Sequence, residues 1–152
     1  MSDFPAPLYI TESGGWDTHI NQGNDQGQLA RKIADVAQAI SLFVKELGDR
    51  IEDTTILAVS EFGRTLKENG NKGTDHGHGC CYLIFNGQLR PRRILTQWKE
   101  LKKENLYEER DLPITTDARL IFSEVLSSQF KIKDLGKVFP NFKFDRKLNL
   151  YI

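Results

Sequence analysis

One apolar stripe constrains the fold of this chain more than any other feature of its sequence. Between residues 29 and 47, apolar side chains recur at spacings of three and four, the period of an α-helix with one buried face. Gly48 follows, where a left-handed C-terminal cap is expected. The sequence therefore predicts a helix that buries one face. The stripe consists of Leu29, Ile33, Val36, Ala37, Ile40, Val44 and Leu47.

Two strand-like runs flank this helix. Residues 7–11 form a short apolar run, and residues 54–60 are β-branched and almost continuously apolar, as in a strand buried on both faces. A strand, an amphipathic helix and a buried strand in this order predict a right-handed parallel crossover. We therefore expect an α/β fold with a mainly parallel sheet and flanking helices, in a single domain over residues 1–152.

The second half of the chain predicts three further elements. Residues 80–85 resemble another buried strand, and a helix is expected over about residues 117–130, capped by Thr115 or Thr116. The tail over residues 131–152 keeps several large apolar side chains, so we expect it to pack against the body of the protein.

The composition limits the classes of partner and of site. The 21 basic and 21 acidic residues cancel, so the charge favours neither nucleic acid nor an anionic membrane. The arginine-rich residues 90–93 predict a solvated turn, with an anion clasp as the alternative. Cys80 and Cys81 are adjacent, and we interpret them as small core residues rather than as metal ligands or a redox pair.

The sequence gives little evidence of location. No apolar run approaches the roughly 20 residues that span a bilayer, so no membrane partner is expected. The first residues contain no export signal, and the compartment stays open.

All three histidines lie in two glycine-flanked stretches, each beside an aspartate. In the first stretch, Asp17 and His19 follow the strand predicted over residues 7–11. Imidazoles and carboxylates together are the usual ligands of zinc, manganese or iron, so both residues are candidate metal ligands. The alternative is that Asp17 caps a polar turn and His19 is an ordinary surface histidine.

The second stretch lies in a long glycine-rich loop over residues 66–79. Asp75 flanks His76, which makes His76 the stronger candidate ligand, whereas His78 is a ligand, a general acid or merely exposed. The glycines allow the backbone to approach a metal closely. The alternative is a mobile loop without function.

A carboxylate stands directly after the predicted strand over residues 54–60. Glu61 would lie at the sheet edge where such folds bind ligands, as a metal ligand or as a rim residue facing water. Arg64 would either neutralise Glu61 or hold an anionic group of a substrate.

Four ordered motifs resemble a known family. The chain is similar to the domain-of-unknown-function 1501 family, an uncharacterised bacterial family distantly related to alkaline phosphatases and arylsulfatases. The resemblance covers nearly the whole chain and points to the carboxyl-terminal part of a longer domain. The motifs lie at residues 14–22, 60–65, 73–77 and 110–119, and residues 138–140 resemble the closing segment.

The resemblance implies an α/β sandwich of the alkaline-phosphatase and sulfatase type, with metals at the carboxyl edge of the sheet. Asp17 and His19 look like the first ligand pair, Glu61 like the acidic member of the second pair, and His76 like the later histidine. Phe62 stands where that superfamily carries the histidine of the second pair. Members of the family are often exported.

The implied activity is metal-dependent hydrolysis of a phosphate or sulfate ester. Zinc is the first expectation, with manganese or calcium as alternatives, and the substrate would be an anionic small molecule or carbohydrate ester. Arg64 would steady the anionic group, and Asp75 and His78 would orient ligands or move protons.

We expect the chain to be incomplete as an enzyme on its own, because the nucleophile of the superfamily comes from a preceding segment. A second copy or a complementing chain would cover the open sheet edge. The alternative is a non-catalytic metal-binding or interaction domain that retains the fold.

Overall fold

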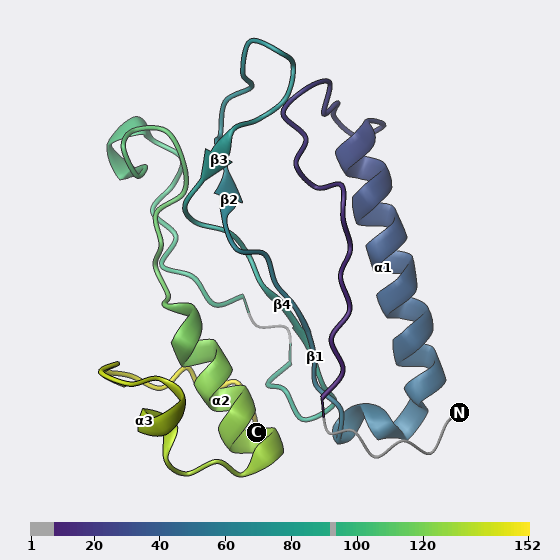
Figure 1. The fold of residues 1–152 in the computed structure, drawn as a ribbon, viewed down its shortest axis with the longest axis vertical. Helices are drawn as coiled ribbons and strands as arrows, with labels where there is room; N and C mark the ends of the chain where they lie inside the picture. Colours follow the sequence, from purple (N-terminus) through teal and green to yellow (C-terminus); the bar gives the residue numbers. More distant parts are fainter. Residues whose placement is uncertain (1–7, 92–93) are drawn as a thin grey trace.

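A computed structural model describes residues 8–91 and 94–152 (Figure 1). Helices and short strands are mixed, as in an α/β-like protein. Pro7 of the first predicted strand, and Arg92 and Arg93 of the predicted turn, lie outside the described residues. The α-helices are α1 (Gln28–Leu47), α2 (Ala118–Phe130) and α3 (Leu135–Val138), and the 3-10 helices are η1 (Gly48–Glu52) and η2 (Lys103–Asn105). The strands are β1 (Ile56–Ala58), β2 (Gly63–Arg64), β3 (His76–Gly77) and β4 (Leu83–Phe85).

The strands form two small antiparallel sheets. Strand β1 pairs with β4, with Leu57 opposite Ile84, and β2 pairs with β3, with Arg64 opposite His76. The parallel crossover expected between residues 7–11 and 54–60 is absent from the described part of the chain. Its described first segment is extended backbone outside any strand, and β1 pairs instead with β4.

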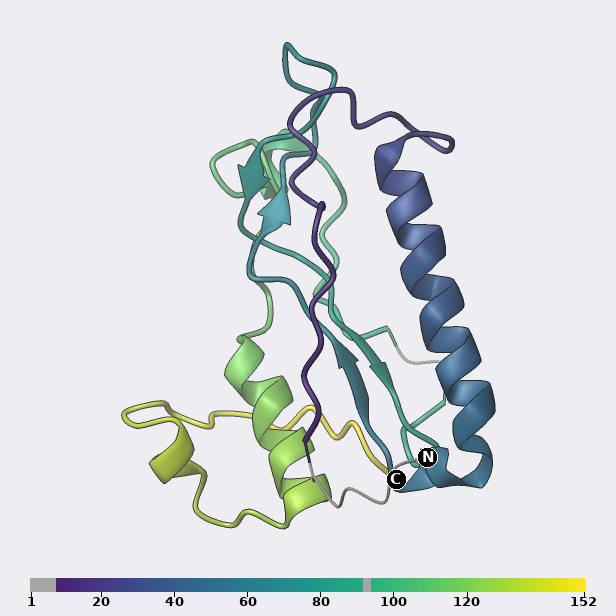
Figure 2. The ribbon, with the colours of Figure 1, turned by 45° about the vertical axis from the view of Figure 1, so that its right-hand side comes forward.

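Helix α1 confirms the prediction from the apolar stripe. Gly48 follows it with a φ of 53° and a ψ of −130°, a conformation that favours glycine but differs from the predicted left-handed cap, and its N–H donates to the Val44 carbonyl. Burial of the stripe is partial, since Leu47 is buried whereas Ile33 remains 53% exposed. Both ribbon views show α1 set apart from the β1–β4 pair, and the extended amino-terminal segment runs along that strand pair (Figures 1 and 2).

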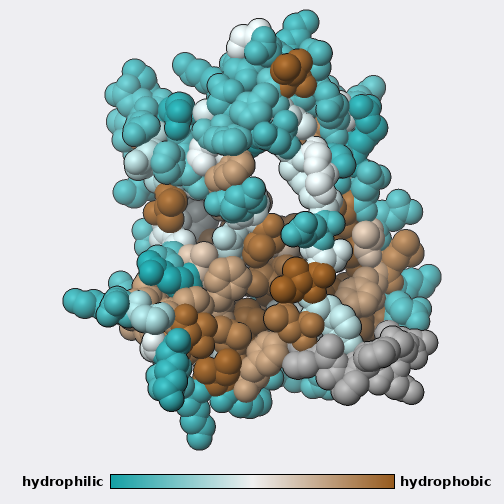
Figure 3. All heavy atoms as spheres, viewed as in Figure 1, coloured by the Kyte–Doolittle hydropathy of each residue, from teal (hydrophilic) through white to brown (hydrophobic). Residues whose placement is uncertain are grey.

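The buried core lies between α2 and the carboxyl-terminal tail. It consists of Leu120, Leu148 and Leu150, and partly buried side chains such as Ile84 of β4 pack against it. The tail therefore packs on the body, as expected from its apolar content. Apolar side chains also gather on the lower part of the near face, over the sheet that β1 and β4 form (Figure 3).

One carboxylate of α2 contributes three hydrogen bonds to the tail. Glu124 of α2 accepts hydrogen bonds from the backbone N–H groups of Leu148, of Asn149 at 2.9 Å and of Leu150 at 2.8 Å. Since backbone donors must be satisfied when a segment is buried, this carboxylate acts together with the antiparallel bridge between Leu89 and Tyr151 to hold the tail.

Two local predictions were wrong. Asp117, rather than Thr115 or Thr116, caps α2, because its carboxylate accepts the Arg119 backbone N–H at 2.9 Å. Cys80 and Cys81 are exposed instead of buried, since the strand predicted over residues 80–85 shortens to β4. In the described residues, the helices are too short or too polar to cross a bilayer.

Candidate metal centre

Two loops that are distant in sequence come together above the sheets. The backbone N–H of Gln22 donates to Lys72 O at 2.8 Å, that of Asn21 donates to Asn71 O at 3.0 Å, and that of Thr74 donates to Thr18 O. Backbone hydrogen bonds thus join the loop over residues 18–22 to the loop between β2 and β3. This pairing fixes the relative positions of the two histidine-containing stretches.

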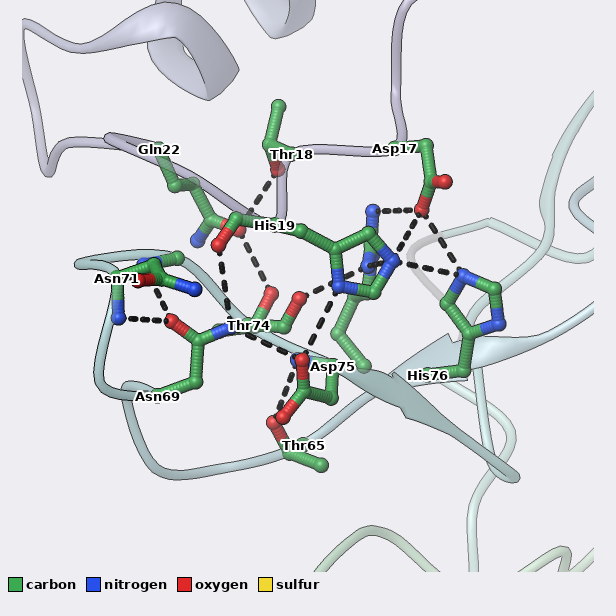
Figure 4. Close-up of polar contacts among 12 residues, drawn as sticks. Asp17, Thr18, His19, Gln22, Thr65, Asn69, Asn71, Thr74, Asp75 and His76 are labelled. Atoms are coloured by element: carbon green, nitrogen blue, oxygen red, sulfur yellow. Dashed lines mark hydrogen bonds and ion pairs between the residues drawn. The ribbon is translucent and has the colours of Figure 1, made fainter.

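Small and polar side chains make this close approach feasible. A Cβ atom on Gly73 would lie 2.2 Å from the carbonyl carbon and oxygen of His19, so only glycine fits there. The side-chain oxygen of Gln22 accepts from the hydroxyl groups of Thr18 and Thr74, both at 2.7 Å (Figure 4). Gly73 therefore provides the space for the two loops to approach, and Gln22 connects them by hydrogen bonds.

Three potential ligand atoms converge where the loops meet. Asp17 Oδ1 lies 3.0 Å from His19 Nε2 and 2.9 Å from His76 Nε2, and the two imidazole nitrogens lie 3.1 Å apart (Figure 4). Donor atoms around a tetrahedral zinc ion, with bonds of about 2.0–2.1 Å, are separated by roughly 3.3 Å. The observed triangle is therefore close to the size that such an ion requires. Asp17, His19 and His76 are the one set of three or more potential ligands within the described residues.

Asp75 lies behind His19. Its Oδ1 is 3.1 Å from His19 Nδ1, and the Asn69 amide donates to that same oxygen at 2.9 Å and to the His19 carbonyl at 3.1 Å. A proton on Nδ1 directed at Asp75 leaves the Nε2 lone pair facing Asp17 and His76. The hydrogen bonds from Asn69 and then His19 hold the pKa of Asp75 below its ordinary value.

Arg64 of β2 is directed at the same cluster. Its Nη2 donates to Asp17 Oδ1 at 2.7 Å and to Trp16 O at 2.8 Å, and its Nη1 donates to Thr74 O at 2.9 Å. The sequence left two roles for Arg64, a pair with Glu61 or a contact with an anionic group, and the structure pairs Arg64 with Asp17 instead. The hydrogen bond with His76, followed by the charges of His19 and Arg64, lowers the pKa of Asp17.

Glu61 does not join the converging ligand atoms. It is exposed at the bend after β1, where its charge, after partial desolvation and Cys81, contributes to the raised pKa of the nearby Cys80 thiol. The neighbouring Phe62 does reach the cluster, with its ring centroid 4.1 Å from that of His76.

His78 forms a second, separate pair with a residue that the site predictions missed. Its Nδ1 lies 3.0 Å from Asp111 Oδ2, its backbone N–H donates to the same oxygen, and its ring stacks on Tyr107 at a centroid distance of 3.9 Å. Asp111 is fully buried and also accepts from Arg110 Nε at 3.0 Å. The only signal in the sequence was its place in the motif over residues 110–119.

The pKa of Asp111 depends on its burial and on its hydrogen-bond donors. Burial alone would raise its pKa, but the backbone N–H of His78, the Arg110 guanidinium and the His78 ring together lower it. Asp111 therefore remains a carboxylate within the fold.

Comparison with known proteins places the chain in a family. The family model described as "Protein of unknown function (DUF1501)" matches residues 8–141, a range that includes both loops of the cluster and Asp111. No curated protein and no solved structure matches the chain. Because the matched range covers most of the 152 residues, the chain belongs to the DUF1501 family of proteins of unknown function.

Proposed function

We propose that this chain binds one divalent metal ion through Asp17, His19 and His76. The observation that carries the proposal is the triangle of Asp17 Oδ1, His19 Nε2 and His76 Nε2, with sides of 2.9 to 3.1 Å. Two imidazole nitrogens and one carboxylate oxygen suit zinc, and manganese less well. Calcium is the least suited of the three expected ions, because it requires six to eight oxygen ligands.

Neighbouring residues would prepare these ligands. Asp75 would keep the His19 tautomer with its Nε2 free, and Asn69 would hold Asp75 in place. The ring of Phe62 would restrict rotation of His76. The His76 side chain is 50% exposed, so the outer side of the centre is open to water or to a ligand oxygen.

Two readings of this centre differ in whether it turns over a substrate. If the chain is a distant relative of alkaline phosphatases and arylsulfatases and forms the carboxyl-terminal part of such a sandwich, the centre would hydrolyse a phosphate or sulfate ester. In that reading zinc would polarise the ester and acidify a bound water.

The contacts of the candidate catalytic groups favour the second reading, a metal-binding domain without turnover of its own. The Arg64 guanidinium is engaged by Trp16, Asp17 and Thr74 oxygens, so it is not directed at an incoming anion. His78, a candidate for proton transfer, is paired with the buried Asp111 instead of facing the centre. We therefore propose that the isolated chain binds metal and has little or no esterase activity.

Metal binding is tested by titration calorimetry of the chelator-treated protein with zinc, manganese and calcium. We expect one zinc ion per chain and a loss of at least about tenfold in affinity for His76→Ala and Asp17→Ala, since each removes one of three ligands. His78→Ala is the matched control, because its imidazole contacts Asp111 and Tyr107 instead. Absence of zinc binding, or equal losses in His76→Ala and His78→Ala, would refute the site.

Turnover is tested separately with chromogenic phosphate and sulfate esters in the presence of each metal. Metal-dependent hydrolysis that disappears in Asp17→Ala would support the hydrolase. Zinc binding without hydrolysis would support the non-catalytic domain.

A further inference from the structure

The Arg64 guanidinium lies on the same atoms that the proposed metal ion would use. Its Nη2 is 2.7 Å from Asp17 Oδ1, and its Nη1 is 3.5 Å from His19 Nε2. We propose that Arg64 is a built-in competitor of the metal: it neutralises Asp17 in the metal-free protein and must withdraw from that carboxylate when an ion binds. This inference rests on the proposed metal site and assigns to Arg64 the control of its affinity and selectivity.

The competition follows from the crowding of one oxygen atom. Asp17 Oδ1 lies within 3.0 Å of nitrogens from Arg64, His19 and His76. A carboxylate oxygen offers about two lone pairs, so a metal ion bound at Oδ1 would compete with the Arg64 guanidinium for that oxygen. A divalent ion and a guanidinium at neighbouring positions also repel each other. Binding of the metal at Oδ1 should therefore lengthen the Asp17–Arg64 contact.

The structure provides Arg64 with a place to stay after it leaves Asp17. The same guanidinium donates to Trp16 O at 2.8 Å and to Thr74 O at 2.9 Å, one carbonyl from each loop. The side chain is only 23% exposed, so it is held by its surroundings in addition to the Asp17 contact. A small displacement would release Asp17 while Arg64 continues to tie the two loops together.

This arrangement predicts selectivity among cations. The binding free energy of an ion must offset the loss of the Asp17–Arg64 contact. Only ions that bind imidazole nitrogens strongly would therefore displace the guanidinium. Zinc meets this condition, whereas calcium gains little from the nitrogens of His19 and His76. Arg64 would thus lower the affinity for all divalent ions and exclude the weakly bound ones.

The first test compares Arg64→Gln with Arg64→Lys by titration calorimetry with zinc and with manganese. The glutamine amide can donate to the carbonyl groups but carries no charge, so we expect zinc to bind roughly tenfold more tightly than to the wild type, with a gain for manganese as well. Lysine keeps the charge, so its zinc affinity should stay closer to the wild-type value. Equal or weaker binding of zinc by Arg64→Gln, in a variant shown by circular dichroism to be folded, would overturn the inference.

The second test observes the wild-type protein and uses a variant only to assign its signals. The guanidinium NMR signals of Arg64 in the wild-type protein, assigned by their loss in Arg64→Lys, are followed during a zinc titration. We expect them to shift and to lose their protection from solvent exchange, with saturation at one equivalent. Zinc binding that leaves these signals unchanged would refute displacement, whereas a wild type that binds no zinc would refute the metal site itself.

Discussion

His19 Nδ1 lies 3.1 Å from Asp75 Oδ1, and this contact sets which nitrogen of His19 faces Asp17 and His76. Asp75 follows His19 by 56 residues in the chain. The contact therefore exists only because backbone hydrogen bonds hold the two loops together. The effect of Asp75 on any bound ion would be indirect, through the orientation and tautomer of one imidazole.

Asp75→Asn should weaken zinc binding by about 10- to 100-fold, because the neutral amide no longer stabilises the Nδ1–H form of His19. Titration calorimetry measures the change. Asp35→Asn on the exposed side of α1 is the matched control and should bind zinc as the wild type does. Equal affinities of Asp75→Asn and the wild type would show that Asp75 has no role in orienting His19.

Gly73→Ala should separate the two loops, because its Cβ would lie 2.2 Å from the backbone of His19 and no side-chain rotation relieves that overlap. We expect loss of zinc binding together with a lower melting temperature. Gly70→Ala in the same loop is the control, since a Cβ at that position meets no atom within 4 Å. Crosspeaks of Thr18 and Thr74 in NMR spectra would report whether the loops stay in contact.

Asp111→Asn should lower the free energy of unfolding at neutral pH by about 2 kcal/mol, since a buried acceptor of hydrogen bonds from His78 and Arg110 loses its charge. Urea denaturation followed by circular dichroism measures this change. The result contradicts the proposed role if Asp111→Asn is as stable as the wild type at neutral pH.

Acid should weaken the wild-type protein through the same carboxylate. The pKa of Asp111 in the fold lies below its ordinary value of 3.8, so its contribution to stability is complete above that value and disappears as the pH falls through the lower folded pKa. In Asp111→Asn this part of the acid dependence should be missing. Denaturation curves at several pH values below 5 would reveal the difference in slope.

Glu124→Gln should loosen the carboxyl-terminal tail, because the neutral amide keeps only one of the two oxygens that accept from three backbone N–H groups. We expect a loss of about 1–2 kcal/mol in stability. Hydrogen exchange at Leu148 and Leu150 should become faster than in Glu46→Gln, whose side chain lies on the exposed surface of α1. Unchanged exchange would mean that Leu120 and its neighbours hold the tail without the carboxylate.

Local periodicity accounts for the parts of the fold that could be predicted. The stripe from Leu29 to Leu47 and the glycine after it predict α1 closely, because helix formation depends on neighbours three and four residues apart. Strand pairing depends on partners that are distant in the sequence, so the partner of residues 54–60 could not be deduced from that segment alone. The predicted parallel crossover was therefore wrong for the described residues. The antiparallel return of β4 beside β1 replaces it in the described residues.

The amino-acid sequence by itself determined which side chains were available for a metal centre, namely the paired Asp and His groups in two glycine-rich loops. Only the tertiary structure decided how they combine. It joined Asp17, His19 and His76, left Glu61 at an exposed bend, and paired His78 with Asp111. The physical reason is that the potential metal ligands come from residues more than 50 positions apart, and their atoms must lie about 3 Å from one another. The close contact between the backbones of Gly73 and His19 brings these residues together.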